Sequence, residues 1–96
     1  MMNVIELNHP ELLQKKYTDM VQAWMDKTVR ERNYDDVFTC ISYVNSTDET
    51  FKAEAQAVLE WRDKVWRKCY TELNRYQAGE RELPTDIISE LPKLEW

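Results

Sequence analysis

The chain has 96 residues, of which 43% are hydrophobic and 32% charged, as expected for one folded soluble domain. Its single glycine, Gly79, excludes glycine-rich phosphate loops and dinucleotide-binding fingerprints. Its single histidine, His9, argues against histidine-based catalysis and multi-histidine metal sites. The net charge of −5 argues against general nucleic-acid binding. We therefore expect a non-enzymatic protein with no cofactor, no bound metal and no nucleic-acid partner.

Membrane insertion and secretion are not expected either. No apolar run reaches the roughly 18 to 20 residues of a membrane span. Residues 1–10 lack the basic and apolar regions of a signal peptide. The two cysteines, Cys40 and Cys69, have no metal-ligand spacing and lie among apolar neighbours, so we expect reduced thiols in the core.

The first helix is predicted at about residues 10–32. The interior of the chain contains no proline, which favours helices. Pro10 suits the first helical position, with Asn8 or His9 ahead of it, and Asn33 can turn the chain afterwards. The apolar stripe of this helix consists of Leu13, Tyr17, Met20, Val21, Trp24 and Thr28.

A second, short helix is predicted at residues 36–44. Asp35 or Asp36 offers the N-cap. Residues 37–44 are rich in β-branched and aromatic side chains, so local propensity alone would also allow a strand. We predict the helix because no partner strand is evident elsewhere. The two adjacent carboxylates could join a divalent-cation site, but without further acids at a defined spacing N-capping explains them better.

The dominant element is a long helix at about residues 48–78. Ser46 and Glu49 form a capping box at its start, and Gly79 suits a left-handed C-cap. Its apolar residues fall within an arc of about 140°. They are Phe51, Ala55, Val58, Leu59, Val65, Trp66, Cys69, Tyr70, Leu73 and Tyr76. Such a helix is roughly 45 Å long, so we expect an elongated fold or a bent helix.

The C-terminal tail is predicted to contain a short helix at residues 85–91, capped by Thr85. Its apolar residues would either hold the tail against the long helix or reach a partner. They are Leu83, Ile87, Ile88, Leu91, Leu94 and Trp96. The predicted fold is thus one all-α domain over residues 1–96. It is a helical hairpin or three-helix arrangement dominated by one long helix, with an ordered C-terminal tail.

Arg62 lies in the middle of the apolar arc of the long helix, where an unpaired charge would be costly. One interpretation is an internal ion pair with Asp35 or Asp36 that fixes how the helices dock. The other is a site where Arg62 meets a carboxylate of a partner protein. In both cases we expect Arg62 to be buried or covered.

Aromatic residues suggest where a partner would bind. The chain has four tryptophans, and Trp24 and Trp66 lie centrally on their stripes, so we expect both in the core. Trp61 and Trp96 do not, and exposed tryptophan is a typical interface anchor. The predicted partner-binding residues are Trp61, Arg62, Leu91, Leu94 and Trp96.

The charged residues on the outer helix faces are expected to be solvated. On the long helix a basic stripe could alternatively meet an acidic protein surface. It consists of Lys64, Arg67, Lys68 and Arg75. On the first helix Asp19 and Asp26 lie seven residues apart on one face, and we expect both to face water.

Two sequence blocks carry a resemblance to a known family. The first block is Arg32-Asn33-Tyr34-Asp35-Asp36, then Ser42-Tyr43, then Phe51-x-x-Glu54-Ala55-x-Ala57. The second is Trp61-Arg62-Asp63-x-Val65-Trp66-x-x-Cys69-Tyr70, then Gln77-Ala78-Gly79-x-Arg81-x-x-Pro84-Thr85 and Glu90-Leu91-Pro92. Over residues 20–96 the chain resembles small proteins encoded among the tail genes of tailed bacteriophages and prophages. Similar stretches look like the C-terminal part of longer tail-fibre-related proteins.

The resemblance implies a non-enzymatic tail protein or a chaperone for tail-fibre assembly. Its partner would be a phage tail or tail-fibre protein, and a second copy of the chain is the other candidate. It would act in the host cytoplasm during phage assembly or remain in the virion tail. No catalytic residues come with the resemblance.

A rival hypothesis is a phage-encoded inhibitor of a host defence enzyme, a role that suits small acidic proteins. Mimicry of DNA would need carboxylates at phosphate-like spacing. In this chain acids and bases alternate instead, which favours the assembly role over the inhibitor.

Overall fold

The structure, a computed structural model, describes residues 10–96, and side chains from residue 14 onward. Its elements are the α-helices α2 (Pro10–Val29), α3 (Val37–Ile41) and α4 (Glu49–Gln77), and the 3₁₀ turns η1 (Arg30–Arg32) and η2 (Ile88–Glu90). No strand occurs in this part of the chain, so the all-α prediction is confirmed. The predicted caps Asn8 and His9 lie outside the described residues, as does the side chain of Leu13.

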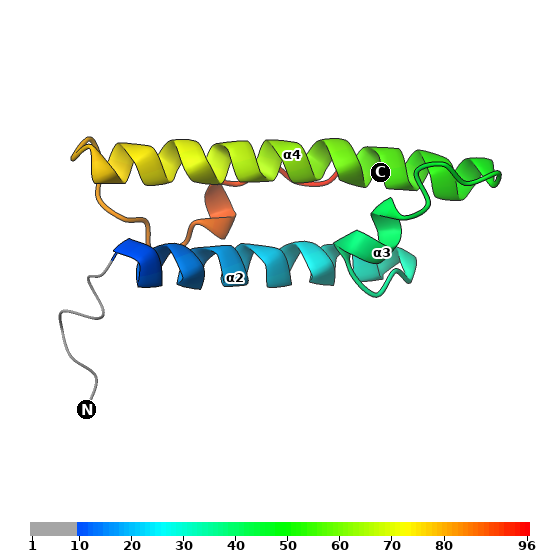
Figure 1. Ribbon diagram of the computed structural model, residues 1–96, viewed down its shortest axis with the longest axis horizontal. Helices are drawn as coiled ribbons and strands as arrows, with labels where there is room; N and C mark the ends of the chain where they lie inside the picture. Colours follow the sequence, from blue (N-terminus) through cyan, green and yellow to red (C-terminus); the bar gives the residue numbers. More distant parts are fainter. Residues whose placement is uncertain (1–9) are drawn as a thin grey trace, which may run out of the picture.

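Helices α2 and α4 run antiparallel as a hairpin, with α3 in the connection at one end (Figure 1). After α4 the chain turns back and runs along one face of the hairpin, passing behind α4 in this view (Figure 1). The radius of gyration is 15.8 Å and the principal extents are 51 × 30 × 19 Å. A compact domain of this length would have a radius of gyration of about 12.5 Å, so the expectation of an elongated fold is confirmed.

The end of the first helix follows from Asn33. Its φ of 70° is left-handed, a conformation that asparagine tolerates better than most residues. The backbone N–H of Asn33 donates to the carbonyl of Arg30 over 3.0 Å, which closes the 3₁₀ turn η1. Together α2 and η1 span the predicted residues 10–32.

The second predicted element is a helix and not a strand, but it covers only Val37–Ile41 of the predicted residues 36–44. The Asp36 carboxylate caps it by accepting from the backbone N–H of Thr39 at 2.6 Å. A second carboxylate, that of Asp26 on α2, accepts from the backbone N–H of Val37 at 2.9 Å. The expectation that Asp26 faces only water is therefore wrong, because the turn after α2 brings the start of α3 against it. Beyond Ile41 the backbone hydrogen bonds are those of turns: the N–H of Tyr43 donates to the carbonyl of Cys40, and that of Val44 to Ile41. The helix therefore ends three residues before the predicted residue 44.

The N-cap of α4 is Asp48, whose carboxylate accepts from the backbone N–H of Phe51 at 3.0 Å. The predicted capping box with Ser46 is wrong. The Ser46 hydroxyl instead accepts from the backbone N–H of Asp48 at 3.0 Å and orders the turn before the helix. Asp48 takes the cap because its side chain is two residues closer to the first free N–H groups of the helix.

The C-terminal end of α4 confirms the prediction for Gly79. Its φ is 76°, in the left-handed region that glycine adopts without steric cost. The N–H of Gly79 donates to the carbonyl of Tyr76, and the N–H of Glu80 donates to that of Arg75. This pair of hydrogen bonds is the Schellman motif. It reverses the chain and directs the tail back along the hairpin.

The core lies between α2, α4 and the returning tail. Its buried residues are Val21, Met25, Val29, Tyr34, Val37, Cys40, Val58, Trp61, Val65, Ile87 and Leu91. Of the two alternatives for the tail, the structure shows the first: the tail packs against the helices.

The short helix predicted at residues 85–91 is reduced to the 3₁₀ turn η2, and Thr85 does not cap it. The backbone N–H of Ser89 donates to the Asp86 carboxylate at 3.3 Å instead. A segment this short is not stable as a helix by itself. Its conformation is set by Ile87 and Leu91, both of which are buried.

Both cysteines are free thiols, as predicted. Cys40 is buried and Cys69 is partly buried among the residues packed against the core. Burial raises the pKa of both thiols to about 11. Both are therefore protonated at neutral pH and behave as small apolar side chains.

Candidate functional site

Trp61 is not an exposed anchor. Only 4% of it is exposed, and its ring packs edge-on against Trp24 with the centroids 5.3 Å apart. Its indole N–H donates to the backbone carbonyl of Pro92 in the tail at 2.8 Å. The prediction of an exposed Trp61 is wrong because the C-terminal tail packs against the α2–α4 hairpin. The tail covers the side of α4 on which Trp61 lies.

The tail residues predicted to bind a partner are largely occupied in the fold itself. Leu91 is buried in the core, and Leu94 packs against it. Trp96 is half-buried and stacks on the ring of Tyr34, with the centroids 6.4 Å apart. Of the predicted tail residues, Trp96 is thus the one that borders an exposed aromatic surface.

Arg62 is also placed differently from the prediction. Its side chain is 37% exposed, and its guanidinium donates to the neighbouring Asp63 carboxylate at 3.1 and 3.3 Å. The predicted burial and the pair with Asp35 or Asp36 are therefore wrong. The prediction placed the buried side of α4 at the centre of its apolar arc.

The buried side of α4 is instead rotated from that centre by roughly 60°. Its buried residues are Ala55, Val58, Trp61, Val65 and Glu72. Of these, Val58, Trp61 and Val65 belong to the core cluster with α2 and the tail. The rotation leaves one edge of the apolar arc, with Trp66 and Tyr70, at the open side of the hairpin.

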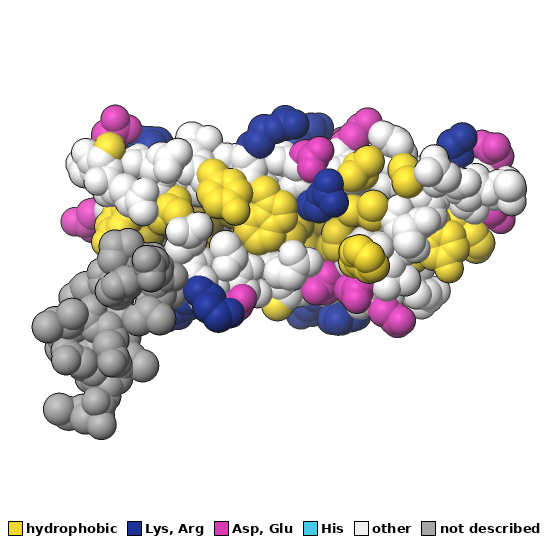
Figure 2. All heavy atoms as spheres, in the orientation of Figure 1, with side chains coloured by type: hydrophobic (Ala, Val, Ile, Leu, Met, Phe, Trp, Pro, Cys, Tyr) yellow, Lys and Arg dark blue, Asp and Glu magenta, His cyan; other side chains and the backbone are white. Residues whose placement is uncertain are grey.

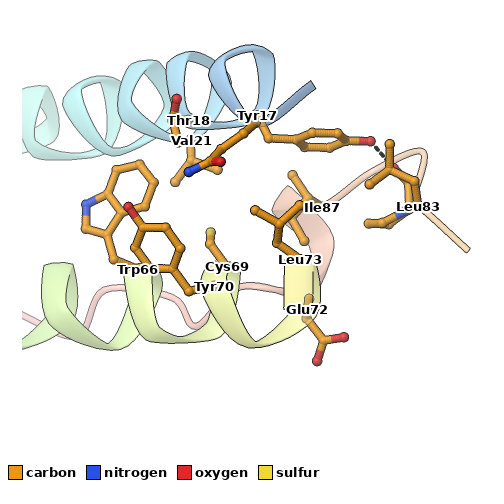
Figure 3. A pocket seen from close by; sticks show the side chains of 12 residues that line it. Tyr17, Thr18, Val21, Trp66, Cys69, Tyr70, Glu72, Leu73, Leu83 and Ile87 are labelled. Carbon is orange, nitrogen blue, oxygen red and sulfur yellow. Dashed lines mark hydrogen bonds between the residues drawn. The ribbon is translucent and has the colours of Figure 1, made fainter. Parts of the chain in front are cut away.

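We refer to Trp66 and Tyr70 together as the aromatic seam, because they lie between α2 and α4. Their ring centroids are 6.4 Å apart, and Tyr70 is 49% exposed. Both side chains project from α4 toward α2 (Figure 3). Hydrophobic side chains form a row of patches along this junction, interrupted by charged and other polar side chains (Figure 2).

Two shallow hollows of 520 and 500 Å³ border the aromatic seam, and both include Trp66 and Tyr70. The hollow of 520 Å³ lies on α4, and its other lining residues are Asp63, Arg67, Thr71 and Asn74. The hollow of 500 Å³ extends to α2, and its other lining residues are Thr18, Asp19 and Gln22. The aromatic seam is therefore flanked by an exposed arginine, Arg67, on one side and an exposed carboxylate, Asp19, on the other.

A second aromatic surface lies at the α3 end of the hairpin. Tyr43 contacts Tyr34 on one side and Phe51 on the other, with centroid distances of 5.9 and 5.3 Å. Tyr43 and Phe51 are exposed, and Phe38 on α3 is 84% exposed. We call the three exposed residues Phe38, Tyr43 and Phe51 the end cluster.

Glu54 connects the end cluster to the last residue of the chain. It accepts a hydrogen bond from the Tyr34 hydroxyl at 2.9 Å and pairs with the Arg32 guanidinium. That guanidinium lies 4.9 Å from the ring centroid of Trp96, at cation–π distance. Burial and the hydrogen bond to Glu54 raise the pKa of Tyr34, so it remains a donor. The position of Trp96 is thus set by Tyr34 and Arg32 together.

An ion network centred on Glu72 holds the start of the tail. Glu72 is 4% exposed, and its carboxylate accepts from Lys68 at 3.0 Å, Arg75 at 3.0 Å and Arg81 at 2.6 Å. Arg81 also donates to the Glu90 carboxylate at 2.7 and 3.0 Å. The basic stripe is therefore only partly a solvated face, because Lys68 and Arg75 bind this carboxylate.

The sequence alone indicated part of this ion network. Lys68 and Arg75 lie four residues before and three residues after Glu72, which are the spacings of neighbours on a helix surface. The contribution of Arg81 depends on the chain reversal at Gly79, so no helical spacing indicates it. These contacts, with Arg81 the strongest, lower the pKa of Glu72 to about 2.

We expect the ion network to make stability depend on acidic pH. The pKa of Glu72 is about 2 in the folded protein, against an ordinary value of 4.5, and that of Glu90 is also lowered, chiefly by Arg81. The network therefore contributes stability above about pH 4.5, which is lost as the pH falls toward 2. The melting temperature should drop through this window less in Glu72→Gln than in the unmodified protein.

The measurement is thermal unfolding by circular dichroism between pH 7 and pH 2. Glu31→Gln removes an exposed carboxylate on η1 and should follow the unmodified protein. Parallel pH curves for Glu72→Gln and the unmodified protein would contradict the prediction.

One cavity lies between the first half of α2, the second half of α4 and the tail (Figure 3). Its volume is about 40 Å³, and its surface is almost entirely apolar. The hydroxyl of Tyr17 borders it and donates to the carbonyl of Pro84 at 2.6 Å. A cavity that binds benzene measures about 150 Å³, so this space is a packing gap and does not fit a metabolite.

In comparisons with known proteins, no family model, no curated protein and no solved structure matches this chain. Among the residues that the structure describes, no group of three or more His, Cys, Asp or Glu side chains could hold a metal ion. None of the helices between Pro10 and Trp96 has both the length and the apolar character needed to cross a bilayer. The two exposed aromatic surfaces are the most distinctive features of the described chain.

Proposed function

We propose that this protein is a non-enzymatic bacteriophage protein, a tail component or a chaperone for tail-fibre assembly, that works by binding another protein. The observation that carries the binding role is the exposure of the end cluster, above all Phe38 at 84%. Exposed aromatic side chains beside charged residues are typical of protein interfaces. The phage role is supported by the resemblance of residues 20–96 to tail-gene proteins.

The end cluster has the properties of a preformed binding surface. Tyr43 is in contact with both Tyr34 and Phe51. Phe38 projects from a helix that is capped by Asp36 and tied to α2 through Asp26. A surface that is already ordered loses little conformational entropy on binding. We therefore assign the tail-fibre partner to this end of the hairpin, with Trp96 at its border.

The test is co-expression of the full chain with the tail-fibre protein of the same phage. We expect soluble fibre protein only when this chain is present. Phe38→Ala should reduce soluble fibre at least about tenfold while leaving the melting temperature unchanged, because a surface substitution changes stability by at most about 0.5 kcal/mol. Met20→Ala, which truncates an exposed apolar side chain on α2, should leave fibre solubility intact.

Fibre protein that is equally soluble without this chain, or with Phe38→Ala, would refute the assignment. The rival inhibitor role predicts a different phenotype. A phage lacking the gene would then make normal fibres and fail only in hosts that carry the defence enzyme.

A further inference from the structure

We propose that two copies of this chain associate through their aromatic seams, with Asp19 of each copy paired to Arg67 of the other. The resulting dimer is a four-helix arrangement built from the α2–α4 hairpins of both copies. This inference goes beyond the proposed function, because it concerns the open side of the α2–α4 junction and not the end cluster, and it needs no phage protein.

The first support is the mismatch between the apolar and the buried sides of α4. Arg62, Trp66 and Tyr70 follow one another at intervals of four residues, so they form one stripe on the helix. The fold buries the neighbouring stripe with Trp61 and Val65, whereas Trp66 is half-buried and Tyr70 is 49% exposed. One edge of both rings borders the core and the cavity next to the tail, but the outer edge of this stripe, above all Tyr70, is not covered within the described chain. Helical hairpins bury such a side when they pair into four-helix bundles.

The second support is the size of the open face. The two largest extents of the molecule are 51 and 30 Å, and hydrophobic patches, interrupted by charged and other polar side chains, follow the long one (Figure 2). A stable protein interface buries about 800 Å² on each partner. About half of a face of these dimensions is sufficient for such an interface.

The third support, which identifies a second copy as the occupant, is charge. Asp19 and Arg67 flank the aromatic seam from opposite sides, one on α2 and the other on α4. A two-fold axis parallel to the helices lays α2 of one copy over α4 of the other, antiparallel. The same rotation brings each Asp19 over the Arg67 side of the other copy. The face is thus complementary to itself, as a two-fold interface requires.

The neighbouring charges allow this pairing. Asp19 binds Lys15 at 3.0 Å, but both side chains are exposed, so this pair contributes little and can exchange. Asp63, beside Arg67, already pairs with Arg62 at 3.1 Å. Arg67 is exposed on α4 and pairs with no acid between residues 14 and 96, so it can meet the carboxylate of a second copy.

The experiment measures the mass of the full chain in solution by sedimentation equilibrium over a range of concentrations. The unmodified protein should reach twice the chain mass of 11.6 kDa. Tyr70→Ala removes an exposed ring from the aromatic seam and should weaken association at least about tenfold. A protein that stays monomeric at every concentration, or a dimer that Tyr70→Ala does not weaken, would overturn the proposal.

Charge reversal tests the arrangement itself. Asp19→Arg alone and Arg67→Glu alone should each raise the dissociation constant by about tenfold or more, because like charges then face each other across both symmetric contacts. An equimolar mixture of the two variants should associate again, since every contact in the mixed dimer joins an arginine to an acid. Lys64→Glu changes the net charge as Arg67→Glu does, on an exposed residue that lines neither hollow, and should have no effect.

Recovery in the mixture cannot arise from a contact within one chain, so it identifies a contact between copies. Variants that both lose association but do not recover on mixing would refute the Asp19–Arg67 pairing. Circular dichroism melting of each variant confirms that the fold is retained, as expected for exposed positions.

Discussion

Trp61→Ala should lower the free energy of unfolding by about 3–5 kcal/mol, the usual cost of truncating a buried tryptophan. Trp61 joins all three parts of the fold: it projects from α4, packs on Trp24 of α2 and donates to the carbonyl of Pro92 in the tail. Its loss would leave a cavity at the centre of the hairpin. Urea unfolding followed by circular dichroism measures the change.

Two further variants make this result specific. Trp61→Phe retains most of the apolar contact but leaves the Pro92 carbonyl without its donor, so we expect a smaller loss of about 1–3 kcal/mol. Phe38→Ala truncates an exposed ring and should change the stability by no more than about 0.5 kcal/mol. Equal losses for Trp61→Ala and Phe38→Ala would show that Trp61 is not part of the core.

Leu91→Ala should be the second most damaging change, with a loss of about 2–5 kcal/mol. Leu91 is buried against the hairpin although it lies only five residues before Trp96. Lys93→Ala, two residues further along, alters an exposed side chain and should be nearly neutral. Thermal and urea unfolding of both variants distinguish a tail that packs on the helices from a tail that extends into solvent. Equal stability of the two would refute the packed tail.

The two core variants should also interact. The hydrogen bond from Trp61 to Pro92 and the burial of Leu91 both depend on the docked tail. Either substitution loosens the tail, so the double variant should lose less stability than the sum of the single losses. Strict additivity would mean that the tail and α4 are stabilised independently.

The order and type of the helices could be predicted because they depend on local chemistry. The apolar period of the long helix, the left-handed conformations of Asn33 and Gly79, and the Asp36 cap all involve residues within a few positions of one another. Such local features form helices and turns regardless of where the later part of the chain packs. They were sufficient for an all-α, elongated hairpin with its turns at the right places.

The errors in the candidate site share one cause. A helical projection assumes that the helix buries the centre of its apolar arc, and this assumption placed Arg62 inside and Trp61 at the rim. The returning tail covers one side of α4, so the buried direction rotates toward Trp61 and away from Trp66 and Tyr70. No pattern within the helix specifies where a segment more than twenty residues later will pack.

The sequence by itself therefore determined the helical class, the approximate ends of the two long helices and the supply of apolar surface, all of which depend on near neighbours. Only the tertiary structure decided which of that surface is buried. In the folded protein the tail packs against Trp61, and Arg81, which follows the turn at Gly79, pairs with Glu72. The outer edge of the aromatic seam and the end cluster remain exposed. The physical reason is that burial is a competition among all apolar surfaces for a limited core, and its outcome depends on contacts between distant parts of the chain.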